Sequence, residues 1–168
     1  MLLALHRRPD LWNADSFRTT YEGTPHGEVD DILLRYSASD GRSRDTVLHD
    51  EEPVWHPAAS LLPWRPIVSD LMRRVEAYRL DRLLVTRLGM GKRILPHADT
   101  GRYDVNTERT RFHIVLLGHP GSLYHNGNET VCMKTGEVWT FTAHETHSVE
   151  NNSNEDRIHL IADLSIYP

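Results

Sequence analysis

Two side chains with the chemistry of metal ligands, His97 and Asp99, lie two positions apart in residues 94–99. If this segment is a β-strand, its side chains alternate between two faces, so the imidazole and the carboxylate point the same way. A further imidazole, His147, begins a strand-like run fifty positions later. Two histidines and one carboxylate bind Fe(II) on one side and leave the opposite positions open. We therefore predict an iron site formed by His97, Asp99 and His147.

An arginine, Arg157, follows His147 by ten residues and begins the apolar segment 157–164. A guanidinium in so apolar a strand needs an anionic partner, which is either a protein carboxylate or a ligand. The same spacing favours His147 over the nearby His144 as the third ligand. Only His147 opens a strand-like run that is followed by arginine ten residues later.

The candidate ligands belong to a larger set of segments that come in a characteristic order. These segments are His97-Ala98-Asp99-Thr100-Gly101, Arg111-Phe112-His113, Gly121-Ser122-Leu123, Gly136-Glu137-Val138-Trp139, His147-Ser148-Val149-Glu150-Asn151 and Asp156-Arg157-Ile158-His159-Leu160-Ile161. The set resembles the aspartyl/asparaginyl beta-hydroxylase family, iron- and 2-oxoglutarate-dependent dioxygenases with a double-stranded β-helix fold. It covers roughly the C-terminal half of the chain. Because some animal members lack the metal-binding carboxylate, Asp99 makes the chain more similar to bacterial and viral members.

The resemblance implies four residues that bind the cosubstrate, 2-oxoglutarate. Arg157 would bind its far carboxylate, because a guanidinium meets a carboxylate with two parallel donors. Thr86 occupies the place of a hydroxyl that assists in this family. Arg111 and His113 resemble the family's Arg-x-His pair, in which the histidine contacts the cosubstrate and the arginine contacts cosubstrate or substrate. Considered alone, Thr86 is simply a good strand former and Arg111 a surface strand residue.

The resemblance also implies the reaction and its partners. Family members use dioxygen, convert 2-oxoglutarate to succinate and carbon dioxide, and hydroxylate an unactivated C–H bond. We expect an oxygenase that hydroxylates an amino-acid side chain, either in a small molecule or within a peptide or protein. Residues 101–107 make a longer loop than in the animal members, so the resemblance does not name the substrate. The oligomeric state is not indicated by any pattern.

Two other functions are compatible with parts of the pattern. A cupin-type metal dioxygenase or isomerase would use the same three ligands without 2-oxoglutarate, but it would leave Arg157 unexplained. A non-catalytic jelly-roll binding module would need no open-faced ligand set. Iron-dependent turnover without 2-oxoglutarate would favour the first, and failure to bind iron would favour the second.

The elements that must position these residues are short strands separated by turn residues. The strands are predicted at 31–36, 82–88, 92–98, 110–117, 122–125, 129–134, 137–142, 147–151 and 157–164. Asn126-Gly127 between two of them is a strong hairpin signal. The eight strands after residue 81 favour a mainly β fold with a flanking helix, a double-stranded β-helix of the jelly-roll, cupin-like barrel type.

One amphipathic helix is predicted before these strands. Its apolar stripe, with Ser69 as the cap, should pack against one sheet from outside. The stripe consists of Val68, Leu71, Met72, Val75 and Tyr78. Residues 1–30 form an arm without a chemical motif, and residues 42–66 a loop able to cover a barrel mouth. We expect one domain over 1–168, with the arm, a strand and the helix in 1–80 and the β-helix core in 81–168.

Composition narrows the class of protein. Apolar content of 39%, charged content of 26% and a net charge of -5 are typical of a soluble globular protein. Nucleic-acid binding is not expected, because such proteins carry a basic surface. No segment approaches the length needed to span a membrane. The single cysteine, Cys132, cannot form an internal disulfide, so we expect a cytoplasmic protein.

Overall fold

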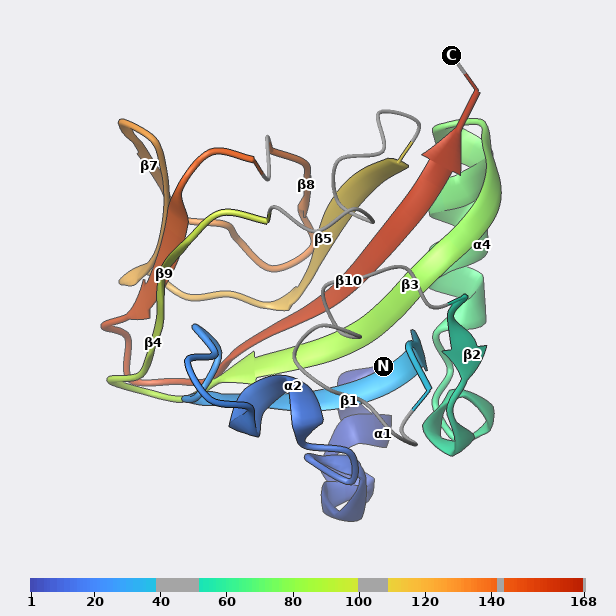
Figure 1. Ribbon diagram of the computed structural model, residues 1–168, viewed down its shortest axis with the longest axis horizontal. Helices are drawn as coiled ribbons and strands as arrows, with labels where there is room; N and C mark the ends of the chain where they lie inside the picture. Colours follow the sequence, from blue (N-terminus) through green and yellow to red (C-terminus); the bar gives the residue numbers. More distant parts are fainter. Residues whose placement is uncertain (39–51, 100–108, 142–143, 168) are drawn as a thin grey trace.

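Two β-sheets make up most of the computed structural model, which describes residues 1–38, 52–99, 109–141 and 144–167. The larger sheet has six strands in the order β2-β1-β3-β10-β5-β8 (Figure 1). Its strands are β1 (Val29–Tyr36), β2 (Val54–Trp55), β3 (Ala77–Leu88), β5 (Arg109–Leu117), β8 (Val138–Trp139) and β10 (Arg157–Ile166). The long strands β3 and β10 lie at its centre, and every strand pair in the sheet is antiparallel.

The smaller sheet has four strands in the order β4-β9-β6-β7. They are β4 (Arg93–His97), β6 (Ser122–Asn126), β7 (Glu129–Val131) and β9 (His147–Asn151). The turn between β6 and β7 contains Gly127 at φ +55°, as the predicted Asn-Gly hairpin requires. Apolar side chains from both sheets pack together at one end, among them Leu88 and Val115 from the larger sheet and Tyr124 and Val149 from the smaller. In the described residues no strand is shared, so the two sheets face each other without closing into a barrel.

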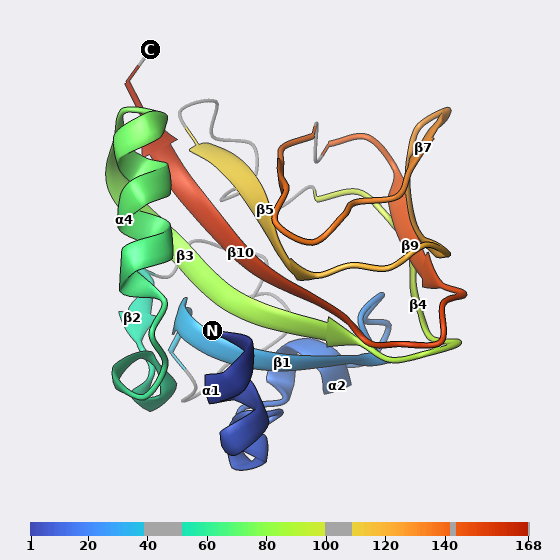
Figure 2. The same cartoon turned by 180° about the vertical axis from the view of Figure 1, so that it is seen from behind.

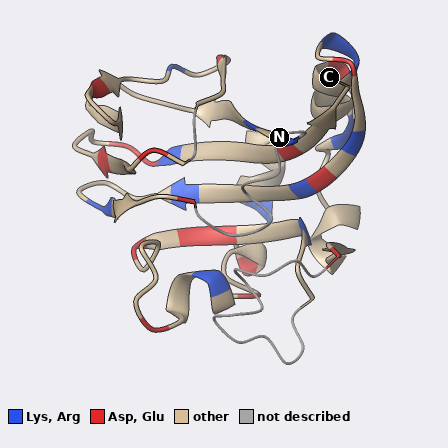
Figure 3. Cartoon of the chain, turned by 45° about the horizontal axis from the view of Figure 1, so that its top comes forward, with Lys and Arg blue, Asp and Glu red and all other residues tan. Residues whose placement is uncertain are grey.

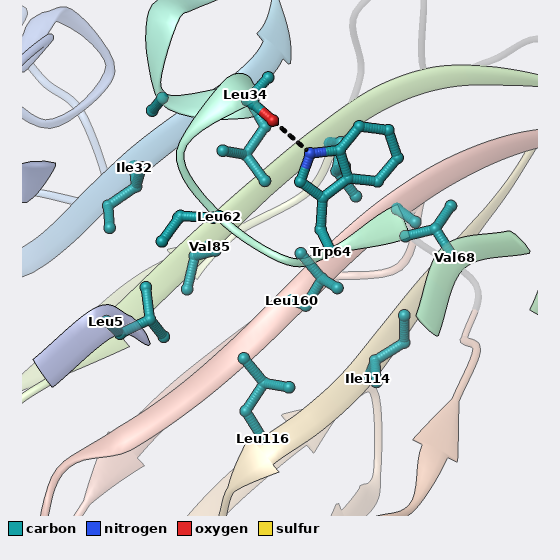
Figure 4. Close-up of a cluster of buried hydrophobic side chains, with 14 of the residues drawn as sticks. Leu5, Ile32, Leu34, Leu62, Trp64, Val68, Val85, Ile114, Leu116 and Leu160 are labelled. Carbon is teal, nitrogen blue, oxygen red and sulfur yellow. Dashed lines mark hydrogen bonds between the residues drawn. The ribbon is translucent and has the colours of Figure 1, made fainter. Parts of the chain in front are cut away.

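The outward face of the larger sheet carries the main apolar core. Helices α1 (Leu2–Arg7) and α4 (Arg65–Arg74) lie on this face, together with the turn η2 (Pro57–Ser60) (Figure 2). Alternate strand residues such as Ile32, Val85 and Leu160 meet Leu5, Trp64 and Val68 there (Figure 4). The Trp64 indole donates a hydrogen bond of 2.8 Å to the Ala59 carbonyl. The predicted packing of the helix against the outside of a sheet is therefore confirmed.

The predicted bounds of this helix are partly wrong. It begins at Arg65 and has Pro66 in its first turn, where a missing backbone N–H costs nothing, so Ser69 lies inside the helix and caps nothing. It ends at Arg74, and Glu76 takes a positive φ of 54°. Tyr78 consequently lies in β3, which begins five residues before the predicted strand at 82–88.

The remaining elements differ from prediction mainly in length. Strands β7 and β8 are shorter than the predicted segments 129–134 and 137–142. The N-terminal arm contains the short turn η1 (Pro9–Leu11) and the one-turn helix α2 (Phe17–Thr20). The predicted loop at 101–107 and residues 42–51 of the predicted loop at 42–66 fall outside the described residues. None of the helices that the structure describes is both long enough and apolar enough to cross a membrane.

Candidate metal centre and its cavity

The three predicted metal ligands lie together at one edge of the smaller sheet. His97 ends β4, His147 begins β9, and the two are opposite each other in the strand register. Their ring centroids are 4.3 Å apart, and His97 Nε2 lies 3.8 Å from Asp99 Oδ1. One ligand atom from each of the three residues falls within 4.8 Å of the others. Among the described residues this is the one group of three or more histidine, cysteine or acidic side chains close enough to share an ion.

Hydrogen bonds to the backbone fix both imidazoles in a form that suits a metal. His97 Nδ1 lies 2.8 Å from the Leu95 carbonyl oxygen, and His147 Nδ1 lies 3.0 Å from that of Glu145. A carbonyl oxygen only accepts, so each Nδ1 carries a proton, which leaves Nε2 as the nitrogen that can bind a metal. Burial lowers the pKa of His97, which further favours the neutral ligand form. The donor set therefore fits a divalent transition metal.

The carboxylate ligand is held by an arginine. One Arg111 nitrogen, Nη1, donates to Asp99 Oδ2, while Nε and Nη2 bind Asp163 at 2.8 and 3.1 Å. Burial alone would raise the pKa of Asp99, but Arg111 and the other basic groups around the carboxylate together outweigh burial, and the pKa is lowered. Asp99 is thus held as a carboxylate, with Oδ1 turned towards His97. The structure places Arg111 against the ligand Asp99, a contact that the sequence did not predict.

Arg157 is a buried cation in the wall of the cavity beside these ligands. Its side chain is on the inward face of β10, and the residue is only 4% exposed. Its hydrogen bond in the described structure is from Nη2 to His159 Nδ1, at 3.1 Å, and no described carboxylate lies within ion-pair distance. Burial lowers its pKa to about 10, so it is still charged at neutral pH. The sequence predicted that Arg157 pairs with either a protein carboxylate or an anionic ligand. Among the described residues there is no such protein carboxylate.

Two buried histidines, His159 and His113, form a hydrogen-bonded chain with Arg157. Because a guanidinium only donates, His159 Nδ1 must be the acceptor, and His113 Nδ1, 3.3 Å away, must donate to the same atom. Burial keeps the pKa of both histidines well below the ordinary value, so they are neutral. His113 Nε2 and the neighbouring Tyr124 hydroxyl are buried, and neither has a hydrogen-bond partner in the part of the chain that is described. Thr86 lies opposite His159 in the register and also lines the cavity.

The cavity has a volume of about 300 Å³ and brings together all seven residues that the sequence singled out. They are His97, Asp99, His147, Arg157, His113, Thr86 and Arg111. His144 is exposed and lies outside the ligand group, with Nδ1 3.2 Å from the Asp99 carbonyl.

Several cavity residues were not predicted. Arg18, Tyr21 and His26 come from the N-terminal arm, and Tyr124 and Phe141 follow the predicted Arg-x-His strand. The arm has no long periodic segment, because α2 is a single turn, so its sequence gave no sign that it reaches the ligands. Tyr124 shares a buried face of β6 with Ser122, but the sequence Ser-Leu-Tyr-His-Asn has no clear apolar alternation that would identify this face as the inward one.

The fold and the clustered side chains define a mainly β protein with a cavity between two sheets, in which His97, Asp99 and His147 are close enough to hold a metal ion. The sequence profile of aspartyl/asparaginyl beta-hydroxylase matches residues 57–166. The chain belongs to the aspartyl/asparaginyl beta-hydroxylase family, and the predicted resemblance is confirmed. A search of the curated proteins found no match.

Solved structures confirm the predicted fold class. The chain is similar to an oxidoreductase of the 2OG-Fe(II) oxygenase family from Burkholderia pseudomallei, with 16% identity and a TM-score of 0.55, over 82% of this chain and 67% of that one. It is also similar to a predicted oxalate decarboxylase from Thermotoga maritima, with 20% identity and a TM-score of 0.41, over 80% of this chain and 92% of that one. The first of these likenesses shows that the arrangement of two facing sheets is shared with a known protein.

Proposed function

We propose that this chain is an Fe(II)- and 2-oxoglutarate-dependent oxygenase that hydroxylates an amino-acid side chain, free or within a peptide. Membership of a hydroxylase family supports the reaction class. The observation that supports the cosubstrate is the buried, charged Arg157 in the same cavity as the ligand group, without a carboxylate partner among the described residues. A buried cation of this kind is costly unless a bound anion pairs with it.

Each cavity residue has a defined task in this proposal. His97, Asp99 and His147 hold the iron, and Arg111 keeps Asp99 ionised and in position. Arg157 pairs with the far carboxylate of 2-oxoglutarate. The iron, together with 2-oxoglutarate and dioxygen, supplies the oxidising chemistry.

The polar atoms near Arg157 complete the cosubstrate site. Burial raises the pKa of Tyr124, so its hydroxyl stays protonated and can donate to a carboxylate. His113 Nε2 is a second buried polar atom without a partner in the described chain, and it accepts because Nδ1 carries the proton. Thr86 offers a second hydroxyl, which can donate, from β3. These three groups make the part of the cavity beside Arg157 polar, as a site for a charged cosubstrate requires.

The proposal is tested by following conversion of 2-oxoglutarate to succinate with and without Fe(II) and dioxygen. We expect turnover to require both, and His147→Ala to reduce it to the background rate, because two protein ligands hold iron weakly. The matched control is His125→Ala, which removes a histidine on neighbouring β6 that bonds Glu150 away from the cavity. Full turnover by His147→Ala would contradict the ligand assignment. Metal-dependent turnover of a substrate without 2-oxoglutarate would favour the cupin-type alternative.

A further inference from the structure

The N-terminal arm forms one wall of the metal cavity, although it precedes the family-matched segment 57–166. Arg18, Tyr21, Pro25 and His26 all line the cavity. The His26 ring stands edge-on to the His97 ring, with centroids 4.8 Å apart. The arm therefore reaches the metal ligands themselves.

Arg18 uses only part of its guanidinium inside the protein. Its Nη1 donates to Asp31 Oδ2 at 2.5 Å, and the Asp31 side chain is completely buried in β1. In the cartoon coloured by charge, an acidic stretch of β1 lies beside a basic segment of the short helix α2 (Figure 3). Nε and Nη2 of Arg18 have no hydrogen-bond partner among the described residues, neither atom is fully buried, and the residue lines the cavity. Two donors on a rigidly held cation are thus available to a ligand.

Arg18 and Arg157 lie on different sides of the cavity. Asp31, which holds Arg18, is opposite Thr86 on β3, and Thr86 is opposite His159 on β10. Two strand spacings, about 10 Å, therefore separate Asp31 from His159, the hydrogen-bond partner of Arg157. Under the proposed function the two carboxylates of 2-oxoglutarate are satisfied by the iron and by Arg157. The free donors of Arg18 then remain for a different anion.

We propose that Arg18 is a specificity-determining residue that binds a carboxylate of the substrate being hydroxylated. This assignment rests on the proposed function and names the substrate class: a molecule that carries a carboxylate close to the bond that reacts. Asp31 neutralises one side of Arg18 and holds it in place, so the cation meets the substrate without first losing side-chain freedom. A carboxylate can come from a free amino acid or from an acidic side chain in a peptide, and both present the same group to Arg18.

The test measures substrate binding under anaerobic conditions, with the full chain loaded with Fe(II) and 2-oxoglutarate. The probes are the twenty L-amino acids, their carboxamides, and blocked Gly-X-Gly tripeptides in which X is Asp, Asn, Glu or Gln. Binding is read from the shift of the visible charge-transfer band and from the melting temperature. We expect at least one carboxylate probe to bind about tenfold or more tightly than its amide, because a charge-assisted pair contributes about 1.5–3 kcal/mol. Free and peptide probes distinguish the two sources.

Variants then connect that preference to Arg18. In Arg18→Ala the preferred carboxylate should bind about tenfold or more weakly, while the band with 2-oxoglutarate alone is retained, and Arg18→Lys should restore part of the binding. The control is Arg87→Ala. Arg87, on β3, pairs at 2.7 Å with Asp30, the residue before Asp31 on β1, and neither residue of this pair lines the cavity. If Arg18→Ala does not fold, Arg18→Gln takes its place and should weaken binding of the preferred carboxylate in the same way. The comparison of carboxylate and amide probes in the unmodified chain tests the proposal without any variant.

Three results would overturn the proposal: no carboxylate probe binds, acids and amides bind equally, or Arg18 substitution leaves the preference unchanged. Failure of the proposed function looks different. In that case Fe(II) and 2-oxoglutarate alone would give no charge-transfer band in the unmodified chain, before any substrate probe is added.

Discussion

The two faces of the six-stranded sheet differ in the side chains that they bury: the outward face buries apolar residues, and the inward face also buries polar and charged ones. Outward residues such as Leu160 and Val85 are completely buried against helices and form the apolar core. Inward residues of the same strands include Arg157, His159 and Asp163, which are equally buried but charged or polar. Because side chains alternate along a strand, one sequence of β10 builds both faces. The outward face supplies stability, and the inward face accepts a cost in stability to hold a site.

The largest effect on stability is expected from the outward face. Leu160→Ala removes a side chain that is 0% exposed in the middle of β10, and should lower the free energy of unfolding by about 2–5 kcal/mol. Denaturant unfolding measures this change. The affinity of the folded fraction for 2-oxoglutarate should be unchanged, because Leu160 points away from the cavity. A loss below about 1 kcal/mol would show that this face is not the main source of stability.

The next effect concerns the carboxylate ligand. In Asp163→Asn, Arg111 is left with Asp99 as its described carboxylate partner and competes with the metal for it, so iron affinity should fall about 10–100-fold. Competition with a chelator gives the affinity. Asp30→Asn, which breaks an ion pair outside the cavity, is the control and should leave iron affinity unchanged.

A smaller effect of opposite sign is expected at Arg157. Replacing this cation with methionine removes a buried charge that lacks a carboxylate partner in the described structure, and should raise the free energy of unfolding by about 1 kcal/mol in the absence of ligand. Thermal or denaturant unfolding of the apoprotein tests this. Marked destabilisation would mean that Arg157 has a structural role, and the contrast between the two faces would not hold at this position.

The smallest effect is expected at Tyr124. Tyr124→Phe keeps the ring, which packs 4.5 Å from Phe141, and removes a hydroxyl with no described hydrogen-bond partner. The concentration of 2-oxoglutarate at half-saturation should rise about fivefold, the usual loss for one hydrogen bond. Stability should be nearly unchanged. An unaltered half-saturation would remove Tyr124 from the cosubstrate site.

Local patterns explain why much of the site could be predicted. The two-residue spacing keeps Asp99, just beyond the end of β4, close to His97, and the ten-residue spacing connects His147 at the start of β9 to Arg157 at the start of β10, so both pairs are close in the sequence. The jelly-roll fold followed from the number of short strands and their turns. Pro66 in the first helical turn is the local signal for the start of α4, and the apolar stripe, which begins at Val68, does not include it.

Residues that reach the site through long-range packing could not be predicted. Arg18 sits on a four-residue helix without periodicity, and its place depends on pairing with Asp31 in a strand further along the chain. Asp163 supports Asp99 through Arg111, a chain of contacts that spans β10, β5 and the end of β4. No local rule connects residues so far apart in sequence.

We propose that the buried, charged Arg157 binds 2-oxoglutarate beside an iron ion held by His97, Asp99 and His147. Anaerobic titration of the Fe(II) form with 2-oxoglutarate, followed by its visible charge-transfer band, tests this most directly. We predict a saturable band in the unmodified chain, and in Arg157→Met the same band at about 100-fold higher 2-oxoglutarate, because a buried charge pair is lost. Equal affinities in the two proteins, or no band in a folded, iron-loaded chain, would contradict the account.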